Sequence, residues 1–127
     1  MIHWLSADQV VQINAYQVAA FGGIDGIRDA GALESAVFSP QNTHAYTGAG
    51  LFECAALYAE RIAQNHAFLD GNKRTGLHAA LLFLAANGQH VPADPDFEDL
   101  MVALTVGEVG VAAFAAILES RSLPLRH

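Results

Sequence analysis

Apolar residues recur three and four positions apart along most of this chain, and this spacing constrains the fold more than any other feature. Alanine occurs 24 times among the 127 residues, and alanine has the highest helix propensity of all residues. Segments that alternate apolar and polar residues, as half-buried strands do, are few. The sequence therefore predicts an all-α fold, a compact helical bundle whose core draws on the 53% of residues that are hydrophobic.

The length of the chain predicts a single domain that spans residues 1–127. Acidic residues outnumber Lys and Arg by 13 to six, which gives a net charge of −7. General binding to nucleic acid or to an anionic membrane needs a surplus of cations, so neither partner is expected. The single cysteine, Cys54, has no partner for an internal disulfide, and the first residues lack the features of a secretion signal. We therefore expect a cytoplasmic protein.

The periodicity predicts six helices, over residues 6–21, 29–38, 51–65, 72–86, 96–106 and 108–120. Ser6 and Gln9 form a capping-box pattern at the start of the first helix. Pro40 predicts the end of the second, because proline has no N–H to donate and disfavours a helical residue before it. Residues 41–50 should then form a loop or small hairpin. The helix over 72–86 is apolar on nearly all sides, so we expect it at the buried centre of the bundle.

The segment between the two central helices, from His66 to Thr75, is the part of the sequence that indicates chemistry. Lys73 and Arg74 lie together in the first turn of a helix, where the helix dipole makes positive side chains mildly unfavourable. Backbone N–H groups at a helix start are unpaired and attract anions, and these two cations strengthen that attraction for phosphate. Gly71 lets the backbone approach the anion closely. The pattern predicts a phosphate site.

Two further residues of this segment fit such a site. Asp70 could hold Mg²⁺, which prefers one or two carboxylates together with phosphate oxygens. His66 suits a general base for a hydroxyl group. Simpler interpretations stay open from the residues alone: Asp70 and Asn72 are common N-cap residues, His66 could just end a helix, and the two cations could be solvated surface charges. Only the phosphate site explains both cations at a helix N-terminus.

The segment from His66 to Thr75 resembles the active-site motif of the Fic/Doc family, specifically its Doc (death-on-curing) branch of toxins from toxin–antitoxin systems. Weaker likeness covers essentially the whole chain, at residues 4–6, 22–26, 33–36, 65–75, 82–84 and 87–88. The resemblance implies an all-α Fic-type bundle with a short flap, a loop or hairpin near the active site that aligns the target. Residues 41–50 are the candidate flap. The resemblance also implies ATP and Mg²⁺ as cofactors.

The resemblance implies a role for each residue of the motif. His66 would act as the base that activates a hydroxyl of the target, Asp70 would hold the metal ion, and Phe68 would anchor the loop in the core. The catalytic residues would then be His66, Asp70 and Arg74. The residues that bind the nucleotide phosphates would be Gly71, Asn72, Lys73 and Arg74.

Two positions distinguish this chain from the adenylyl-transferring Fic enzymes that it resembles. Those enzymes usually have Gly where this chain has Lys73, and a second Arg where it has Leu77. Doc-like toxins share the Asn-Lys-Arg-Thr form, transfer the γ-phosphate of ATP to a threonine of elongation factor Tu, and so block translation. The resemblance therefore implies a protein kinase. Transfer of AMP and a non-catalytic anion-binding subunit are the alternatives.

Regulation is also expected from the resemblance. Self-inhibited Fic proteins carry an inhibitory helix with Ser or Thr four residues before a glutamate. None of the six glutamates of this chain has Ser or Thr at that position. We therefore expect inhibition by a separate antitoxin protein, which supplies a helix to a groove on this chain.

Overall fold

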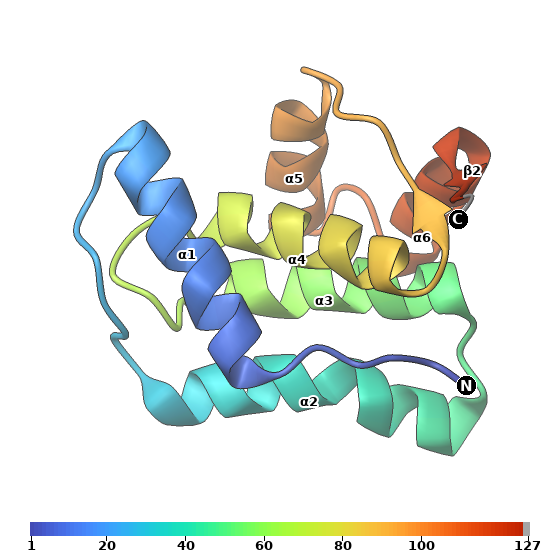
Figure 1. Ribbon diagram of the computed structural model, residues 1–127, viewed down its shortest axis with the longest axis horizontal. Helices are drawn as coiled ribbons and strands as arrows, with labels where there is room; N and C mark the ends of the chain where they lie inside the picture. The colour runs from blue at the N-terminus through green and yellow to red at the C-terminus, as the bar shows by residue number, and fades with distance from the viewer. Residues whose placement is uncertain (126–127) are drawn as a thin grey trace.

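The computed structural model describes residues 1–125 and consists mostly of helices (Figure 1). Within these residues six helices follow one another: α1 (Ala7–Phe21), α2 (Ala30–Thr47), α3 (Leu51–Asn65), α4 (Asn72–Ala86), α5 (Phe97–Thr105) and α6 (Val111–Arg121). The predicted all-α fold is confirmed. Ser6 caps α1 through the predicted capping box with Gln9. None of these helices is long and apolar enough to cross a membrane.

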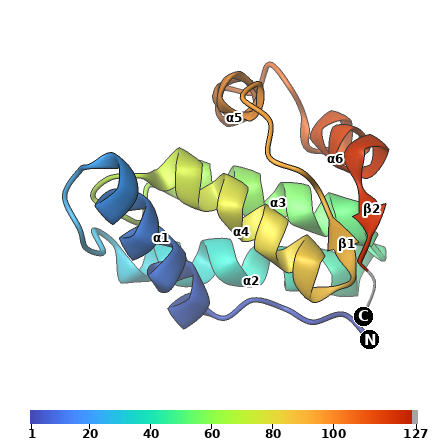
Figure 2. The same ribbon diagram turned by 45° about the horizontal axis from the view of Figure 1, so that its top comes forward.

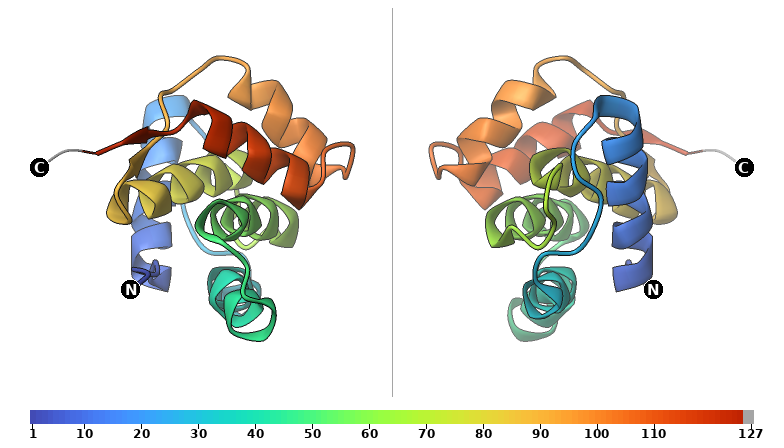
Figure 3. Two further views of the ribbon diagram at one scale, coloured as in Figure 1. Left: turned by 90° about the vertical axis from the view of Figure 1, so that its right-hand side faces the viewer. Right: turned by 90° about the vertical axis from the view of Figure 1, so that its left-hand side faces the viewer.

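Helix α3 is the centre of the bundle. It packs against α2, α4, α5 and α6, and Figure 3 shows α2 on one side of it and α6 on the other. The expectation that the helix over 72–86 is the buried centre is wrong. Helix α1 crosses α4 and covers only part of it (Figure 1). On the uncovered part of α4, Arg74, His78 and Leu82 are exposed.

Small residues let α3 and α4 lie unusually close together. Ala55, Ala59 and Ala63 of α3 and Ala80 of α4 are completely buried. At Gly76 of α4, an added Cβ would lie only 2.6 Å from the carbonyl oxygen of Ala59. Even one methyl group would therefore force the two backbones apart, and the high alanine content of the sequence serves this contact.

Helix α2 continues through Pro40 to Thr47, so two predictions made from this proline are wrong. The helix does not end at residue 38, and the loop or hairpin expected over residues 41–50 is reduced to residues 48–50. Residues 41–47 complete the helix, and Gly48 ends it in the left-handed conformation (φ 72°). Pro40 costs the helix one N–H donor, but it is buried in the face that α2 packs against α3. Tertiary packing of this face outweighs the local preference.

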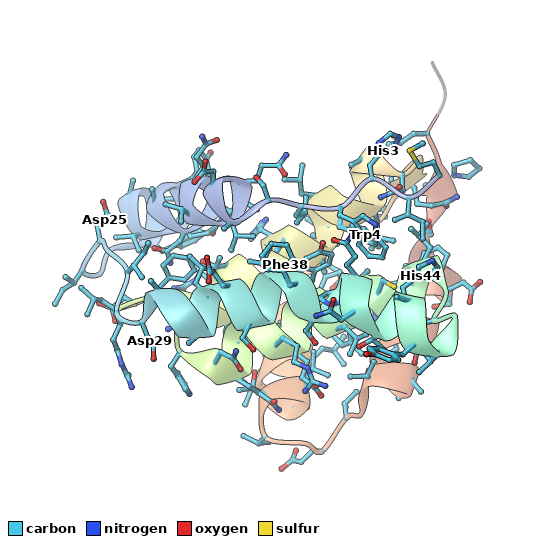
Figure 4. The ribbon with its side chains drawn as sticks, turned by 90° about the horizontal axis from the view of Figure 1, so that it is seen from below. His3, Trp4, Asp25, Asp29, Phe38 and His44 are labelled. Carbon is cyan, nitrogen blue, oxygen red and sulfur yellow. The ribbon has the colours of Figure 1, made fainter. Side chains whose placement is uncertain are left out.

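The residues predicted to form the flap do not lie near the loop between α3 and α4. His44 lies near the C-terminal end of α2, where its ring is 5.5 Å from that of Trp4. Figure 4 shows these two residues at the opposite end of the molecule from Asp25 and Asp29, which belong to the linker between α1 and α2. The linker, residues 22–29, is the segment that lies beside the loop between α3 and α4 (Figure 1).

The C-terminal part was predicted less accurately than the central helices. Helix α6 begins at Val111 rather than at residue 108, because Gly107 (φ 83°) and the cap residue Gly110 extend the turn after α5. Two short strands, β1 (Gln89–His90) and β2 (Leu123–Pro124), pair antiparallel at one edge of the molecule (Figure 2). Strands of two residues carry no periodicity, so they could not be predicted from the sequence.

Candidate active site

The loop between α3 and α4, residues 66–71, is fixed by directed hydrogen bonds around one buried anchor. Phe68 is 1% exposed and anchors the loop in the core, as predicted. The Asn72 side chain closes the loop on itself: its Oδ1 accepts from the N–H of Phe68 (3.1 Å), and its Nδ2 donates to the carbonyl of Phe68 (3.0 Å). The oxygen and the nitrogen of the Asn72 carboxamide therefore both stabilise the turn ahead of α4.

The linker between α1 and α2 runs alongside this loop (Figure 3). Ile27 and Phe68 form an isolated antiparallel bridge. The N–H groups of Arg28 and Asp29 both donate to the carbonyl of Ala67, at 2.7 and 3.1 Å. The linker therefore supports the loop along its length through backbone contacts, which no side-chain pattern in the sequence reveals.

A buried asparagine joins α1 to both the loop and α4. The Nδ2 of Asn14 donates to the carbonyl of Asp70 (2.8 Å) and to Oγ1 of Thr75 (3.1 Å). Asn14 is 1% exposed and Thr75 is completely buried. Sequence reasoning did not identify Asn14, although a polar residue within the buried stripe of α1 was an available signal.

The turn ahead of α4 leaves a run of backbone N–H groups without partners. Gly71, in the left-handed conformation (φ 75°, ψ 20°), precedes the helix, and no side chain caps it. The N–H groups of residues 70–74 donate to no acceptor within residues 1–125, whereas the N–H of Thr75 donates to the carbonyl of Gly71. Successive free N–H groups at the positive end of a helix dipole form a binding site for an anion.

Two cations stand at this helix terminus without carboxylate partners. Lys73 and Arg74 are exposed. The ion pairs found among the described residues are elsewhere, at Arg61 and Arg121. The Cζ atom of Arg74 instead lies over the ring of Phe21, 4.5 Å from its centroid. The predicted cations therefore lie in the same turn as the free N–H groups, and neither of them forms an ion pair within residues 1–125.

The Asp70 side chain faces the linker and keeps one oxygen free of described partners. Its Oδ2 accepts a hydrogen bond from the N–H of Ile24 (2.7 Å). A Cβ at Gly23 would lie 2.9 Å from the Cβ of Asp70, so only glycine fits there. No group of three or more His, Cys, Asp or Glu side chains in residues 1–125 could hold a metal ion. Asp70 therefore fits Mg²⁺ only as a single carboxylate that shares the ion with phosphate oxygens and water.

His66 ends α3 in a conformation that is unusual for its residue type. It has φ 49° and ψ 44°, and it is the one non-glycine residue between positions 1 and 125 with positive φ. Residues in such regions of φ/ψ space cost free energy and occur frequently at functional sites. The side chain is exposed at the start of the loop. Its backbone conformation turns the chain out of α3 toward Asp70.

Three residues that shape this site were not assigned a role from the sequence. They are Asn14, Phe21 and Gly23, all of α1 or the linker, about 50 positions before the loop. Gly23 contributed to the resemblance noted above, but its contact with Asp70 depends on how the linker packs. Conversely, the residues that the sequence singled out, from His66 to Arg74, all lie in one loop and one helix turn.

The comparisons with known proteins agree with this fold. The model of the Fic/DOC family matches residues 4–84. This chain therefore belongs to the Fic/DOC family.

Two relatives of this chain within the family are named as Doc proteins. The "Protein kinase doc" of Escherichia phage P1 is 36% identical over 115 residues, which cover 90% of this chain and 91% of that protein. The "Toxin Doc" of Mycolicibacterium smegmatis is 42% identical over 106 residues, which cover 78% of this chain and 80% of that protein.

Proposed function

We propose that this protein is a Doc-like toxin that acts as a protein kinase and transfers the γ-phosphate of ATP to a hydroxyl group of a protein. The observation that carries this proposal is the run of free N–H groups at residues 70–74 beside two unpaired cations, Lys73 and Arg74. Its two relatives, named as a protein kinase and as a toxin, support the same activity.

The phosphate groups of ATP would bind across the N-terminus of α4. The backbone from Gly71 to Arg74 supplies N–H donors, Lys73 supplies a point charge, and the Arg74 guanidinium can donate to two oxygens at once. Asn72 contributes through its backbone, because its side chain is bonded to Phe68. Phosphoryl transfer depends mainly on such positioning and charge neutralisation, which is the chemistry that this terminus provides.

His66 is the proposed general base. A ring nitrogen of its imidazole can accept the proton of the target hydroxyl as the oxygen attacks the γ-phosphorus. The bond between that phosphorus and the β–γ bridging oxygen breaks, and ADP leaves with the bonding electron pair. The exposed position of His66 at the loop entrance supports this role, because a protein target must reach the imidazole from solvent.

Asp70 is the residue that would hold Mg²⁺. Its free oxygen supplies one carboxylate ligand, and the ion would add charge neutralisation at the phosphates. The contribution of the chain is the orientation of this carboxylate: the N–H of Ile24 fixes Oδ2, which leaves Oδ1 for the ion.

Transfer of a phosphoryl group is favoured over transfer of AMP by two residues. Leu77 is half-buried and packs against the core, so no charged group stands where adenylyl-transferring relatives carry a second arginine. Lys73 is exposed at the anion site, where a glycine would leave open space. Both residues change the part of the site that would hold the outer phosphates for AMP transfer.

The target and the partner are proposed from the family resemblance. The target is elongation factor Tu, whose phosphorylation would block translation in the cytoplasm. The partner is an antitoxin that inhibits the toxin by docking a helix. None of the six glutamates of the sequence has Ser or Thr four residues before it, the pattern of an inhibitory helix, which supports inhibition in trans.

Incubation with elongation factor Tu and ATP labelled at the α- or the γ-phosphate tests the proposal. Label transferred from γ alone is the expected result. Label transferred from the α-phosphate would instead establish an AMP transferase. Absence of transfer from either position, with ATP bound, would contradict the proposed kinase and its target and leave an anion-binding subunit.

A further inference from the structure

The ring of Phe21 lies against Arg74, one of the two cations of the anion site. Phe21 is the last residue of α1, and the Cζ of Arg74 lies 4.5 Å from its ring centroid. We propose that Phe21 is a positioning residue, which holds the Arg74 guanidinium beside the free N–H groups so that it is ordered before phosphate binds. This proposal rests on the proposed function, because it concerns the same site.

The place of Phe21 on α1 is not explained by core packing. Asn14, Gln17, Val18 and Phe21 are spaced three, four and seven residues apart, so they share one face of the helix. The first three are buried, at 7% exposure or less, but the ring of Phe21 is 61% exposed. This face therefore extends one turn beyond the core, and its last side chain contacts the arginine.

A ring holds an arginine in a way that suits a phosphate site. A carboxylate would fix the Arg74 side chain equally well, but it would occupy the N–H groups and compete with phosphate. An aromatic ring attracts the cation without accepting its directed hydrogen bonds. The Arg74 side chain donates no hydrogen bond within residues 1–125, so its donors remain available for an anion.

The ring and the loop are held in a fixed relation by α1 itself. Asn14, two turns before Phe21, is bonded to Asp70 and to Thr75, the neighbours of the phosphate site on either side. An arginine that is already ordered loses less side-chain entropy when it binds phosphate. A cation–π contact at an exposed position corresponds to about a two- to fivefold gain in affinity.

The test compares the variants Phe21→Leu and Phe21→Trp by isothermal titration with ATP and with inorganic triphosphate, both with Mg²⁺. Phe21→Leu should weaken the binding of both ligands about two- to fivefold. Phe21→Trp should keep the affinity of the unaltered chain, since tryptophan is the best partner for a cation. The midpoint of urea unfolding should change little in both. Tyr46→Leu is the matched control: this ring is 91% exposed at the far end of α2, and its loss should leave affinity unchanged.

A double-mutant cycle tests whether the effect of Phe21 acts through Arg74. In an Arg74→Gln background, Phe21→Leu should cause no further loss, because the residue that it positions is gone. Equal losses in both backgrounds would overturn the proposal, because the effect of the ring would not depend on Arg74. A loss of affinity for ATP but not for triphosphate would also overturn it, in favour of direct stacking of the ring on adenine. Tighter binding by Phe21→Leu would overturn it too, since the ring would then compete with phosphate. If the unaltered chain bound neither ligand, the proposed function itself would fail.

Discussion

The contact between α3 and α4 and the loop that joins these two helices are built by opposite means. The contact consists of completely buried alanines and of Gly76, where the backbones approach so closely that no Cβ fits. The loop buries one large side chain, Phe68, and is otherwise fixed by hydrogen bonds from Asn14, Asn72 and the linker. Non-directional packing holds the first region, and directed bonds hold the second.

The difference explains why the site lies in the loop. Close packing buries the facing sides of the two helices, so the contact itself leaves no group to bind a ligand. Hydrogen bonds fix a backbone at a few atoms and leave its neighbours uncovered, as at residues 70–74. The free N–H groups, the unpaired Arg74 and the strained His66 contribute little to stability, and they are available for chemistry. Substitutions in the two regions should therefore have separable effects.

The largest expected effect is on catalysis, from His66→Ala. Removal of a general base should lower the rate of phosphoryl transfer about a thousandfold. The affinity for ATP should stay within about twofold, because the anion site uses other groups. The measurement combines transfer of label from γ-labelled ATP with isothermal titration of ATP.

The control for His66→Ala is His90→Ala. His90 is exposed in β1, beyond the opposite end of α4 from the loop, so this variant should transfer phosphate at the rate of the unaltered chain. A His66→Ala variant that kept its transfer rate would remove the imidazole from the mechanism.

The next effect is on stability, from Gly76→Ala. The added methyl group would lie 2.6 Å from the Ala59 carbonyl oxygen, and overpacking of this kind should lower the free energy of unfolding by about 2–3 kcal/mol. Gly31→Ala is the matched control in a helix, because its Cβ would meet nothing closer than 3.5 Å. That substitution should raise the free energy of unfolding by about 0.5 kcal/mol.

Urea unfolding measures both glycine variants, which should move in opposite directions. A neutral or stabilising Gly76→Ala would show that the α3–α4 contact is looser than described. If Gly76→Ala also abolished ATP binding while the protein stayed folded, the two regions would not be separable.

The smallest effect is a dependence of stability on alkaline pH. Burial raises the pKa of Cys54 from 9.0 to about 11, and burial raises that of Tyr58 from 10.0 to about 12. Above pH 9 the unfolded chain therefore binds fewer protons than the folded chain, so the free energy of unfolding should fall as the pH rises from 9 toward 11. Urea unfolding at pH 8, 9, 10 and 11 measures this fall.

Cys54→Ala isolates one of the two contributions. Both side chains belong to α3, at the centre of the bundle. The variant should lose stability less steeply between pH 9 and 10, where the thiol is the more ionised of the two groups in the unfolded chain. Curves for the two proteins that run parallel across this range would show that the thiol is not buried in the folded state.

The sequence predicted the local parts of this molecule well. The capping box at Ser6, the bounds of α3 and α4 and the anchor Phe68 depend on residues near one another in the chain. The helix terminus with its two adjacent cations is likewise a local pattern. These features follow from propensity, capping and spacing, which a single sequence displays directly.

The parts that sequence reasoning missed depend on contacts between distant segments. Pro40 stays within α2 because that helix packs along α3, and no local rule for proline includes this packing. The roles of Asn14, Phe21 and Gly23 appear only when α1 and the linker lie against the loop. The misplaced flap has the same cause, since the loop expected after Pro40 is reduced to residues 48–50.

The most direct measurement of the central claim is a titration of ¹⁵N-labelled protein with ATP and Mg²⁺, followed through backbone amide resonances in NMR spectra. If the helix terminus holds the phosphates, the amides of residues 70–74 shift most and saturate together, while those of Ala55 and Ala80 in the core barely move. Shifts that are absent at millimolar ATP, or that gather on helices away from the loop, would contradict the account.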